Sequence, residues 1–141
     1  MRFWDSSAIV PLLTGQPATN RMQALAAEES GMLVWWATAV ECASAITRVT
    51  REGLLDDAAA ATAFERLRVI ADGWSEIEPS GPIRQTAIRL LRVHPLKAGD
   101  ALQLAAAVVA AGDYPAALEI VTLDTQLSRA AHKEGFALTG I

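Results

Sequence analysis

Four acidic residues stand where a carboxylate could do chemistry. Asp5 ends a short apolar run at the start of the chain, Glu41 follows the apolar run at 32–36, and Asp124 follows the run at 119–123. Asp100 is the only charge in the otherwise apolar segment 99–111. With no supporting Cys or suitably spaced His, such all-oxygen ligands favour Mg²⁺ or Mn²⁺ over zinc. We interpret Asp5, Glu41, Asp100 and Asp124 as metal-binding and catalytic residues of one acidic pocket.

Carboxylate pockets of this kind hold one or two divalent ions, which activate a water molecule and stabilise charge on a phosphate in transit. Hydrolysis of a phosphodiester bond needs no further protein group. A buried carboxylate also needs a counter-charge or several hydrogen-bond donors. The sequence places few cationic residues near these four acids, so a divalent cation would supply the missing charge.

Each acid also has a purely structural explanation, and for any one of them the two explanations are equally good. Asp5, Asp100 and Asp124 each lie at the start of a predicted helix, where a carboxylate can cap free backbone amides. Thr38 and Glu41 have the spacing of a capping box, in which Glu41 bonds back to the Thr38 amide. Only the combination of the four positions favours a shared pocket.

Four further residues are candidates for supporting roles. Gln103, three residues after Asp100, either orients that carboxylate or satisfies a backbone group. Ser6 and Thr122 flank the pocket, either as hydroxyl ligands or as local caps. Arg48 lies seven residues after Glu41, hence on the same helical face about 10.5 Å further along. It either holds a substrate phosphate there or is an exposed helix residue.

The remaining chemically capable residues favour structural roles. His94 precedes a proline and His132 lies on a polar helix face, so neither is expected to bind metal. Cys42 has no suitably spaced His and is interpreted as a small buried residue. The tryptophans are better explained by packing than by stacking on nucleic-acid bases: Trp4, Trp35, Trp36 and Trp74.

The elements that must position these residues alternate along the chain. Strands are predicted at 1–5, 32–36, 74–77, 119–123 and 136–139. Helices are predicted at 7–13, 18–29, 38–51, about 56–71, from 83 to the His94-Pro95 pair, 99–111 and 125–134. This alternation predicts a three-layer α/β/α fold with a mainly parallel sheet. It also brings Asp5, Glu41 and Asp124 to one edge of that sheet. Apolar spacing puts Phe64 with Leu67 on the apolar face of its helix, and it turns Leu90 and Leu91 inward.

Length and composition exclude several classes of protein. A chain of 141 residues is expected to form a single domain over 1–141. It has no apolar run long enough for a transmembrane helix and no signal-peptide pattern, so we expect a cytoplasmic protein without a membrane partner. A single cysteine cannot form an internal disulfide. The net charge of −4 argues against nonspecific coating of nucleic acid.

Four stretches, in order and at matching separations, resemble one known family over nearly the whole chain. They are WDSSA at 4–8, TAVECASA at 38–45, GDALQLA at 99–105 and TLDTQL at 122–127. The chain resembles a PIN-domain ribonuclease, specifically a VapC-type toxin of a toxin–antitoxin module. Asp5, Glu41, Asp100 and Asp124 stand at the acidic positions of that family. Gln103 stands where histidine is frequent, and Lys97 where arginine is common.

The resemblance implies an endoribonuclease that depends on Mg²⁺ or Mn²⁺ and cuts structured RNA, typically tRNA or rRNA. It also implies a homodimer, and a small cognate antitoxin protein whose tail occupies the active-site groove. These are expectations from the family, whereas the pocket of four acids is an interpretation of this chain's own residues.

Three other functions compete with this interpretation. A PIN-like module that acts mainly by binding protein or RNA would usually have lost an acid, yet all four are present. A haloacid-dehalogenase-type phosphatase would have a second aspartate two residues after Asp5, where Ser7 stands. A receiver-like phosphoacceptor would have a lysine near the last strand, and none is evident. Metal-dependent cleavage of RNA separates the enzyme from the binding module.

Overall fold

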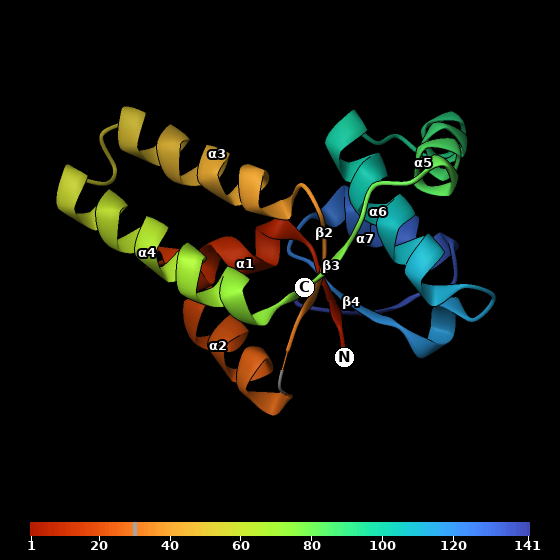
Figure 1. The fold of residues 1–141 in the computed structure, drawn as a ribbon, viewed down its shortest axis with the longest axis horizontal. Coiled ribbons are helices and arrows are strands. Elements are labelled where there is room, and N and C mark those ends of the chain that lie inside the picture. The colour runs from red at the N-terminus through yellow and green to blue at the C-terminus, as the bar shows by residue number, and fades with distance from the viewer. Residues whose placement is uncertain (30) are drawn as a thin grey trace.

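The computed structural model describes residues 1–29 and 31–141, and a five-stranded parallel sheet lies at its centre (Figure 1). Its strands run in the order β3-β2-β1-β4-β5, and every neighbouring pair is parallel. The strands are β1 (Phe3–Trp4), β2 (Leu33–Trp35), β3 (Ser75–Ile77), β4 (Glu119–Val121) and β5 (Ala137–Thr139). The predicted α/β fold with a parallel sheet is confirmed.

Helices cover both faces of the sheet, which completes the three layers (Figure 1). On one face lie α1 (Ser6–Leu13), α2 (Thr19–Glu28), α3 (Thr38–Arg51) and α4 (Asp57–Gly73). On the other face lie α5 (Gly81–Val93), α6 (Ala98–Ala111) and α7 (Thr125–Lys133). A short 3₁₀ helix, η1 (Pro115–Ala117), was not predicted. Among the described helices, none combines the length and the apolar character needed to cross a membrane.

Strand alternation divides the interior into two apolar cores. Successive side chains of a strand point to opposite faces, so Phe3 packs under α5–α7 whereas Trp4 packs under α1–α4. Ile120 and Val121 of β4 divide in the same way. Because both faces are covered, β1 and β2 consist of continuous apolar residues instead of an alternating pattern.

Strand order places the functional edge. The chain moves outward from β1 to β2 and β3 on one side, and then to β4 and β5 on the other. The order therefore reverses between β1 and β4, and ligands of such sheets bind beyond the carboxyl ends of the strands at that point. Asp5 directly follows β1, and Asp124 lies shortly after β4.

Two predicted buried positions are wrong. Phe64 is 41% exposed and Leu91 is 42% exposed. Helix α4 packs against α3 and α1 through the buried residues Ala63 and Leu67, and in α5 the inward position belongs to Leu90. In each helix the predicted stripe included a large residue one position away from the true centre of the buried face.

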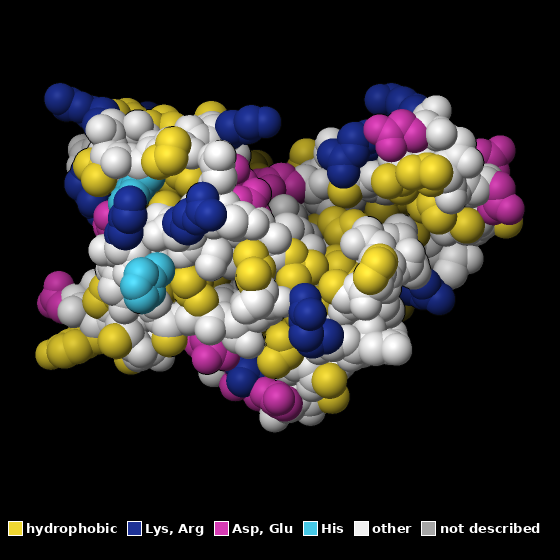
Figure 2. Space-filling model, turned by 180° about the vertical axis from the view of Figure 1, so that it is seen from behind, with side chains coloured by type: hydrophobic (Ala, Val, Ile, Leu, Met, Phe, Trp, Pro, Cys, Tyr) yellow, Lys and Arg dark blue, Asp and Glu magenta, His cyan; other side chains and the backbone are white. Residues whose placement is uncertain are grey.

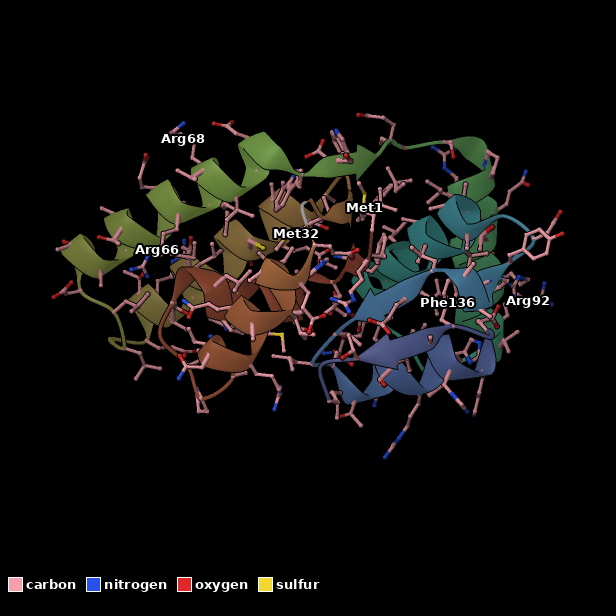
Figure 3. The ribbon with its side chains drawn as sticks, turned by 90° about the horizontal axis from the view of Figure 1, so that it is seen from below. Met1, Met32, Arg66, Arg68, Arg92 and Phe136 are labelled. Atoms are coloured by element: carbon pink, nitrogen blue, oxygen red, sulfur yellow. The ribbon has the colours of Figure 1, made fainter. Side chains whose placement is uncertain are left out.

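Seen from behind, the molecule is hollowed between its two helical layers. Figure 2 shows acidic side chains at the base of this notch and basic side chains on both sides of it. The two helical layers lie on opposite sides of the sheet. In the view from below, Arg68 of α4 and Arg92 of α5 therefore lie toward opposite ends of the molecule (Figure 3).

Candidate active site

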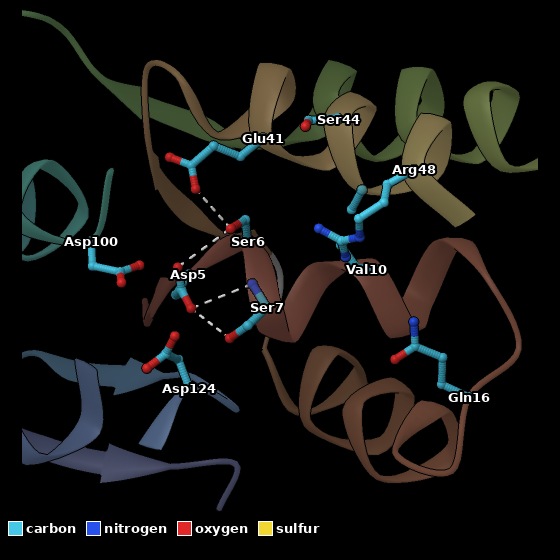
Figure 4. A pocket seen from close by; sticks show the side chains of 11 residues that line it. Asp5, Ser6, Ser7, Val10, Gln16, Glu41, Ser44, Arg48, Asp100 and Asp124 are labelled. Atoms are coloured by element: carbon cyan, nitrogen blue, oxygen red, sulfur yellow. Dashed lines mark hydrogen bonds between the residues drawn. The ribbon is translucent and has the colours of Figure 1, made fainter. Parts of the chain in front are cut away.

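The four predicted acids line one pocket of about 460 Å³, together with Ser6, Ser7 and Arg48. Figure 4 shows that each carboxylate comes from a different part of the fold. Asp5 follows β1, Glu41 is in the first turns of α3, Asp100 is in the first turn of α6, and Asp124 precedes α7. The pocket therefore opens at the edge of the sheet where the strand order reverses.

Asp5 is held by one of its two oxygens. Its side chain is buried, and Oδ2 accepts hydrogen bonds from the Ser7 amide (3.3 Å), from the Ser7 hydroxyl and from Thr122 Oγ1 (2.9 Å). Oδ1 has only a long contact of 3.5 Å with Ser6 Oγ. Because Ser7 Oγ also accepts from Leu123 N (2.9 Å), the hydroxyl fixes Asp5 between the start of α1 and the end of β4.

Glu41 is held in the same one-sided way. Its Oε2 accepts from Ser6 Oγ (2.9 Å) and from Gln103 Nε2 (3.2 Å), and Gln103 also donates to Thr38 Oγ1 (3.1 Å). Neither role suggested for Gln103 was correct, because it orients Glu41 and not Asp100. Its amide nitrogen must face the carboxylate, since an amide oxygen there would meet an acceptor.

Asp124 combines a structural bond with a position in the pocket. Its Oδ1 caps α7 by accepting from Leu127 N (2.9 Å), and its own amide donates to Thr122 Oγ1 (3.0 Å). The Thr122 hydroxyl thus bonds to the Asp5 carboxylate and to the backbone amide of Asp124. It links two of the acidic residues, and its suggested part as a ligand or a local cap remains a prediction. Asp5 likewise caps α1 through Ser7 N.

The cap explanation is wrong for the other two acids. The N-cap of α3 is Ala37, with no side-chain cap bond, and the carboxylate of Glu41 bonds to Ser6 and Gln103 instead of to the Thr38 amide. The N-cap of α6 is Lys97, again without a side-chain cap bond, and Asp100 lies three residues further on. These two carboxylates point to the pocket without capping a helix.

Burial raises the pKa of three of these carboxyl groups, and neighbouring carboxylates add to the effect. Burial and then Asp124 and Asp5 raise the pKa of Asp100 to about 6. The pKa of Asp5 is raised mainly by burial, against the lowering effect of the Ser7 and Thr122 bonds. The pKa of Glu41 is raised by burial, with Asp5 and Asp100 contributing. Each group thus lies in an environment that penalises its negative charge.

The donor set fits a hard divalent cation. In the described part of the chain, no Lys or Arg forms an ion pair with any of the four carboxylates. Asp5 Oδ1, Glu41 Oε1 and Asp124 Oδ2 accept no close protein donor there, and neither do the oxygens of Asp100. Oxygen atoms left available in this way are the ligands that Mg²⁺ and Mn²⁺ prefer. Over the described residues, however, no three acids are already grouped tightly enough to enclose an ion.

The opposite end of the pocket carries different chemistry. Arg48 of α3 and Gln16, which follows α1, lie away from the carboxylates in Figure 4. Gln16, Ser44 and Ser7 were not among the predicted site residues. Ser7 could have been found, because an aspartate that caps a helix accepts from the backbone amide two or three residues further on, and Ser7 is two residues after Asp5. Nothing local marks Gln16, since it joins the pocket only through the folding of the chain after α1.

The residues for which the sequence favoured structural roles include His94, Cys42 and Trp36. His94 Nε2 bonds to Glu134 Oε2 (2.8 Å), and Arg89 pairs with the same carboxylate. Cys42 is buried, which raises the pKa of its thiol to about 12 and makes it unsuitable as a nucleophile. Trp36 differs from the expectation of packing, since 51% of it is exposed.

Comparisons with known proteins agree with this architecture. A family model described as PIN domain matches residues 2–133, and no curated protein matches the chain. A toxin-antitoxin complex from Klebsiella pneumoniae contains a chain that is 21% identical, with a TM-score of 0.62 over 89% of this chain and 88% of that one. VapC20 from Mycobacterium tuberculosis, a sarcin-ricin loop cleaving toxin, is 15% identical, with a TM-score of 0.70 over 97% of each chain. FitAcB from Neisseria gonorrhoeae is 18% identical, with a TM-score of 0.68 over 99% of this chain and 97% of that one. At these identities the structural likeness establishes the fold.

Proposed function

The chain belongs to the PIN domain family, and from that premise we propose that it is a metal-dependent endoribonuclease acting as the toxin of a toxin–antitoxin pair. The observation that carries the proposal is the pocket in which four carboxylates from four parts of the fold converge, none of them ion-paired with a Lys or Arg among the described residues. Three of them have raised pKa values. Such a site favours a ligand that brings positive charge.

In this proposal Asp5, Glu41, Asp100 and Asp124 hold one or two Mg²⁺ or Mn²⁺ ions. When bound, the ion supplies a Lewis acid that activates water and neutralises charge on the scissile phosphate. The proposed hydrolysis breaks an RNA phosphodiester bond. No nucleophilic side chain is needed, which agrees with the buried position of Cys42.

The chain contributes orientation. Ser7 and Thr122 fix Asp5 through Oδ2, and Ser6 and Gln103 fix Glu41 through Oε2. These partners leave the other oxygen of each carboxylate available for the ion. Neighbours that orient ligand carboxylates commonly change metal affinity or activity by about 10- to 100-fold when they are removed.

Arg48 supports binding of the substrate. It lines the pocket at the end away from the acids, and as an exposed cation it can contact a phosphate beside the one being cut (Figure 4). A guanidinium suits this role because its donors match phosphate geometry. The acids then act on the scissile phosphate while Arg48 holds its neighbour.

The proposed partners follow from the fold and from the charge of the pocket. Several solved structures of this fold are toxin–antitoxin assemblies, including one bound to promoter DNA. We propose a cognate antitoxin whose basic or aromatic residue enters the acidic pocket, a homodimer as the active form, and tRNA or rRNA as the substrate. The family resemblance supports the last two.

The decisive experiment is a cleavage assay with purified protein, tRNA and rRNA. The parent should cleave RNA with Mg²⁺ or Mn²⁺ and lose activity in EDTA. Asp5→Asn, which keeps an oxygen for the bonds from Ser7 and Thr122, should fold and yet fail to cleave. A parent protein that binds RNA tightly but leaves it intact with either metal would instead identify a PIN-like binding module.

A further inference from the structure

A second groove opens beside the acidic pocket. It has a volume of about 380 Å³, which lies within the usual range of ~300–1,000 Å³ for ligand pockets. Its lining includes Trp35 and Trp36 at the end of β2, Pro79 between β3 and α5, Arg84 of α5 and Leu102 of α6. None of the proposed catalytic residues lines it.

The groove and the acidic pocket share structural elements. Helix α6 contributes Asp100 to the pocket and Leu102 to the groove. The connection from β2 to α3 likewise carries Trp36 in the groove and leads to Glu41 in the pocket. Because β2 is the direct neighbour of β1 in the sheet, the groove is the next site along the same carboxyl edge. A chain-like ligand could occupy both.

The backbone of Trp36 is hydrogen-bonded to the sheet, while its side chain is exposed to solvent. Its amide donates to Ile77 O (3.1 Å), which continues the β2–β3 pairing, while its side chain is 51% exposed. Trp35 lies beneath the surface beside it, and its buried Nε1 has no hydrogen-bond partner among the described residues. The groove therefore has one exposed indole, Trp36, beside a buried one, Trp35.

Arg84 is the one charged residue among those that line the groove, although the whole chain has a net charge of −4. Helix α5 carries three arginines and no acid. Arg89 is paired with Glu134, whereas Arg84 and Arg92 form no ion pair within the described residues. Arg84, Ile88 and Arg92 are spaced four apart, so they lie along one face of the helix.

We propose that this groove binds an unpaired nucleotide of the RNA strand, next to the nucleotides in the acidic pocket, with its base stacked on Trp36 and its phosphate at Arg84. This inference rests on the proposed function, because it extends the path of the same RNA strand. Aromatic stacking together with a cationic contact is how proteins hold single-stranded RNA. A basic antitoxin tail, in contrast, would be repelled by the arginines of α5.

Equilibrium binding to a short single-stranded RNA, measured in EDTA so that no cleavage occurs, tests the groove directly. Trp36→Ala should weaken binding by roughly 5- to 150-fold, the usual range for one stacked base. Trp36→Tyr should retain most of the affinity. Arg84→Gln should weaken binding and lower the slope of log K against log salt by about 0.7, the value for one phosphate contact on a single strand.

Matched controls carry the same changes elsewhere. Tyr114→Ala removes an aromatic side chain that is 75% exposed beyond the other end of α6. Arg21→Gln removes an exposed cation from α2, which lies among the helices on the other face of the sheet. Both controls should bind RNA like the parent. Equal losses in the controls and in the groove variants would overturn the proposal.

A base-by-base test identifies the stacked nucleotide. Each nucleotide of the RNA is replaced in turn by an abasic one, and the series is measured with parent and with Trp36→Ala. One position should weaken binding to the parent but not to Trp36→Ala, because both changes remove the same contact. If no position shows this coupling, the stacking assignment is wrong. A Trp36→Ala protein that binds RNA normally but loses a dimer in sedimentation equilibrium would instead assign the groove to a second copy of the chain.

The outcomes separate this inference from the proposed nuclease. If the parent cleaves RNA in Mn²⁺ and the Trp36→Ala and Arg84→Gln variants bind RNA as tightly as the parent, the groove proposal is wrong and the nuclease proposal stands. If Trp36 contributes to RNA binding at one base but the parent cleaves no RNA with either metal, the groove proposal stands and the nuclease proposal is wrong.

Discussion

A carboxylate at a junction between strand and helix can serve the fold and a ligand at the same time, because it has two oxygens. Asp124 gives Oδ1 to the Leu127 amide and keeps Oδ2 available, and Asp5 divides its oxygens in a similar way. The sequence presented capping and metal binding as alternatives for these residues. The structure makes the two roles compatible for Asp5 and Asp124, so local sequence alone could not have decided between them.

Glu41 shows why a local motif can mislead. The spacing of Thr38 and Glu41 fits a capping box, yet Thr38 is buried and its hydroxyl accepts from Gln103 instead. Helix α3 begins one residue earlier than that motif requires, with Ala37 as its N-cap. The partner that turns Glu41 toward the pocket lies 62 positions away in the sequence, where no short-range pattern can show it.

Arg48→Ala should raise KM for RNA with little change in kcat. Arg48 lines the pocket away from the carboxylates, so it contacts substrate equally before and during the reaction, and the loss of such uniform binding appears in KM. Steady-state cleavage of a fluorescent RNA measures both constants. Arg51→Ala on the same helix, which does not line the pocket, is the matched control. A large fall in kcat at constant KM would place Arg48 in the chemical step.

Gln103→Met should weaken activation by Mn²⁺ by about 10- to 100-fold, because Glu41 loses the donor that orients it. The cost in stability should be small, near 1 kcal/mol, since the same change also removes the buried amide oxygen that lacks a partner. Titration of cleavage with Mn²⁺ and urea unfolding measure the two effects. Gln103→His keeps a donor and should restore activation. If both variants respond to Mn²⁺ like the parent, Gln103 does not position Glu41.

At the scale of elements, order and type were predictable because helices show a helical spacing of apolar residues and most strands are short apolar runs. Helix α3 matches its predicted range of 38–51, and β3 lies within the strand predicted at 74–77. Strands are shorter than predicted, because a residue belongs to a strand only where its neighbour pairs with it. The inward faces of α4 and α5 were the least predictable. Which side of a helix is buried depends on the helix packed against it, and Phe64 and Leu91 were misplaced for that reason.

The N-terminus of α4 offers a test of local stability away from the pocket. Asp56→Ala should destabilise the protein by about 1 kcal/mol, because the Asp56 side chain accepts from Ala59 N at 2.7 Å and caps the helix. Asp57→Ala, one residue further on, removes the same charge without such a bond and should cost only a few tenths of a kcal/mol. Urea unfolding measures both. Equal costs would show that charge, and not the cap, stabilises this end.

At the scale of the whole molecule, the local sequence could suggest but not establish that the four acids converge on one pocket. Three of the acids follow strands, and a parallel sheet brings such positions to one edge. Asp100 arrives differently, from a helix packed on the far face of the sheet. The 16 acidic residues exceed the 12 basic ones by four, the number of acids at the pocket. The arrangement thus concentrates like charges at one place in an otherwise balanced protein.

This concentration predicts how stability depends on pH and metal. The folded-state pKa values of Asp5, Glu41 and Asp100 are raised, so the folded protein binds more protons than the unfolded chain between the two sets of values. In EDTA, stability from these groups should be present below about pH 4 and should decrease as pH rises through the raised values, near pH 6 for Asp100. Thermal melts from pH 4 to pH 8 measure this decrease against the opposite contributions of other groups.

Divalent metal should reverse that loss, since only the folded pocket binds the ion. At about ten times its dissociation constant, Mn²⁺ should increase the free energy of unfolding by about 1.4 kcal/mol at pH 7.5, or raise Tm by several degrees.

Asp5→Asn keeps an oxygen for the bonds to Oδ2 and removes one repelling charge. In EDTA at pH 7.5 it should therefore melt at or above the parent temperature while losing most of the gain from Mn²⁺. Asp100→Asn should behave alike, and Asp57→Asn, at the start of α4 and outside the pocket lining, should respond to Mn²⁺ as the parent does. A parent whose Tm ignores the metal, together with Asp5 and Asp100 variants that melt lower in EDTA, would mean that these carboxylates stabilise the fold and form no metal pocket.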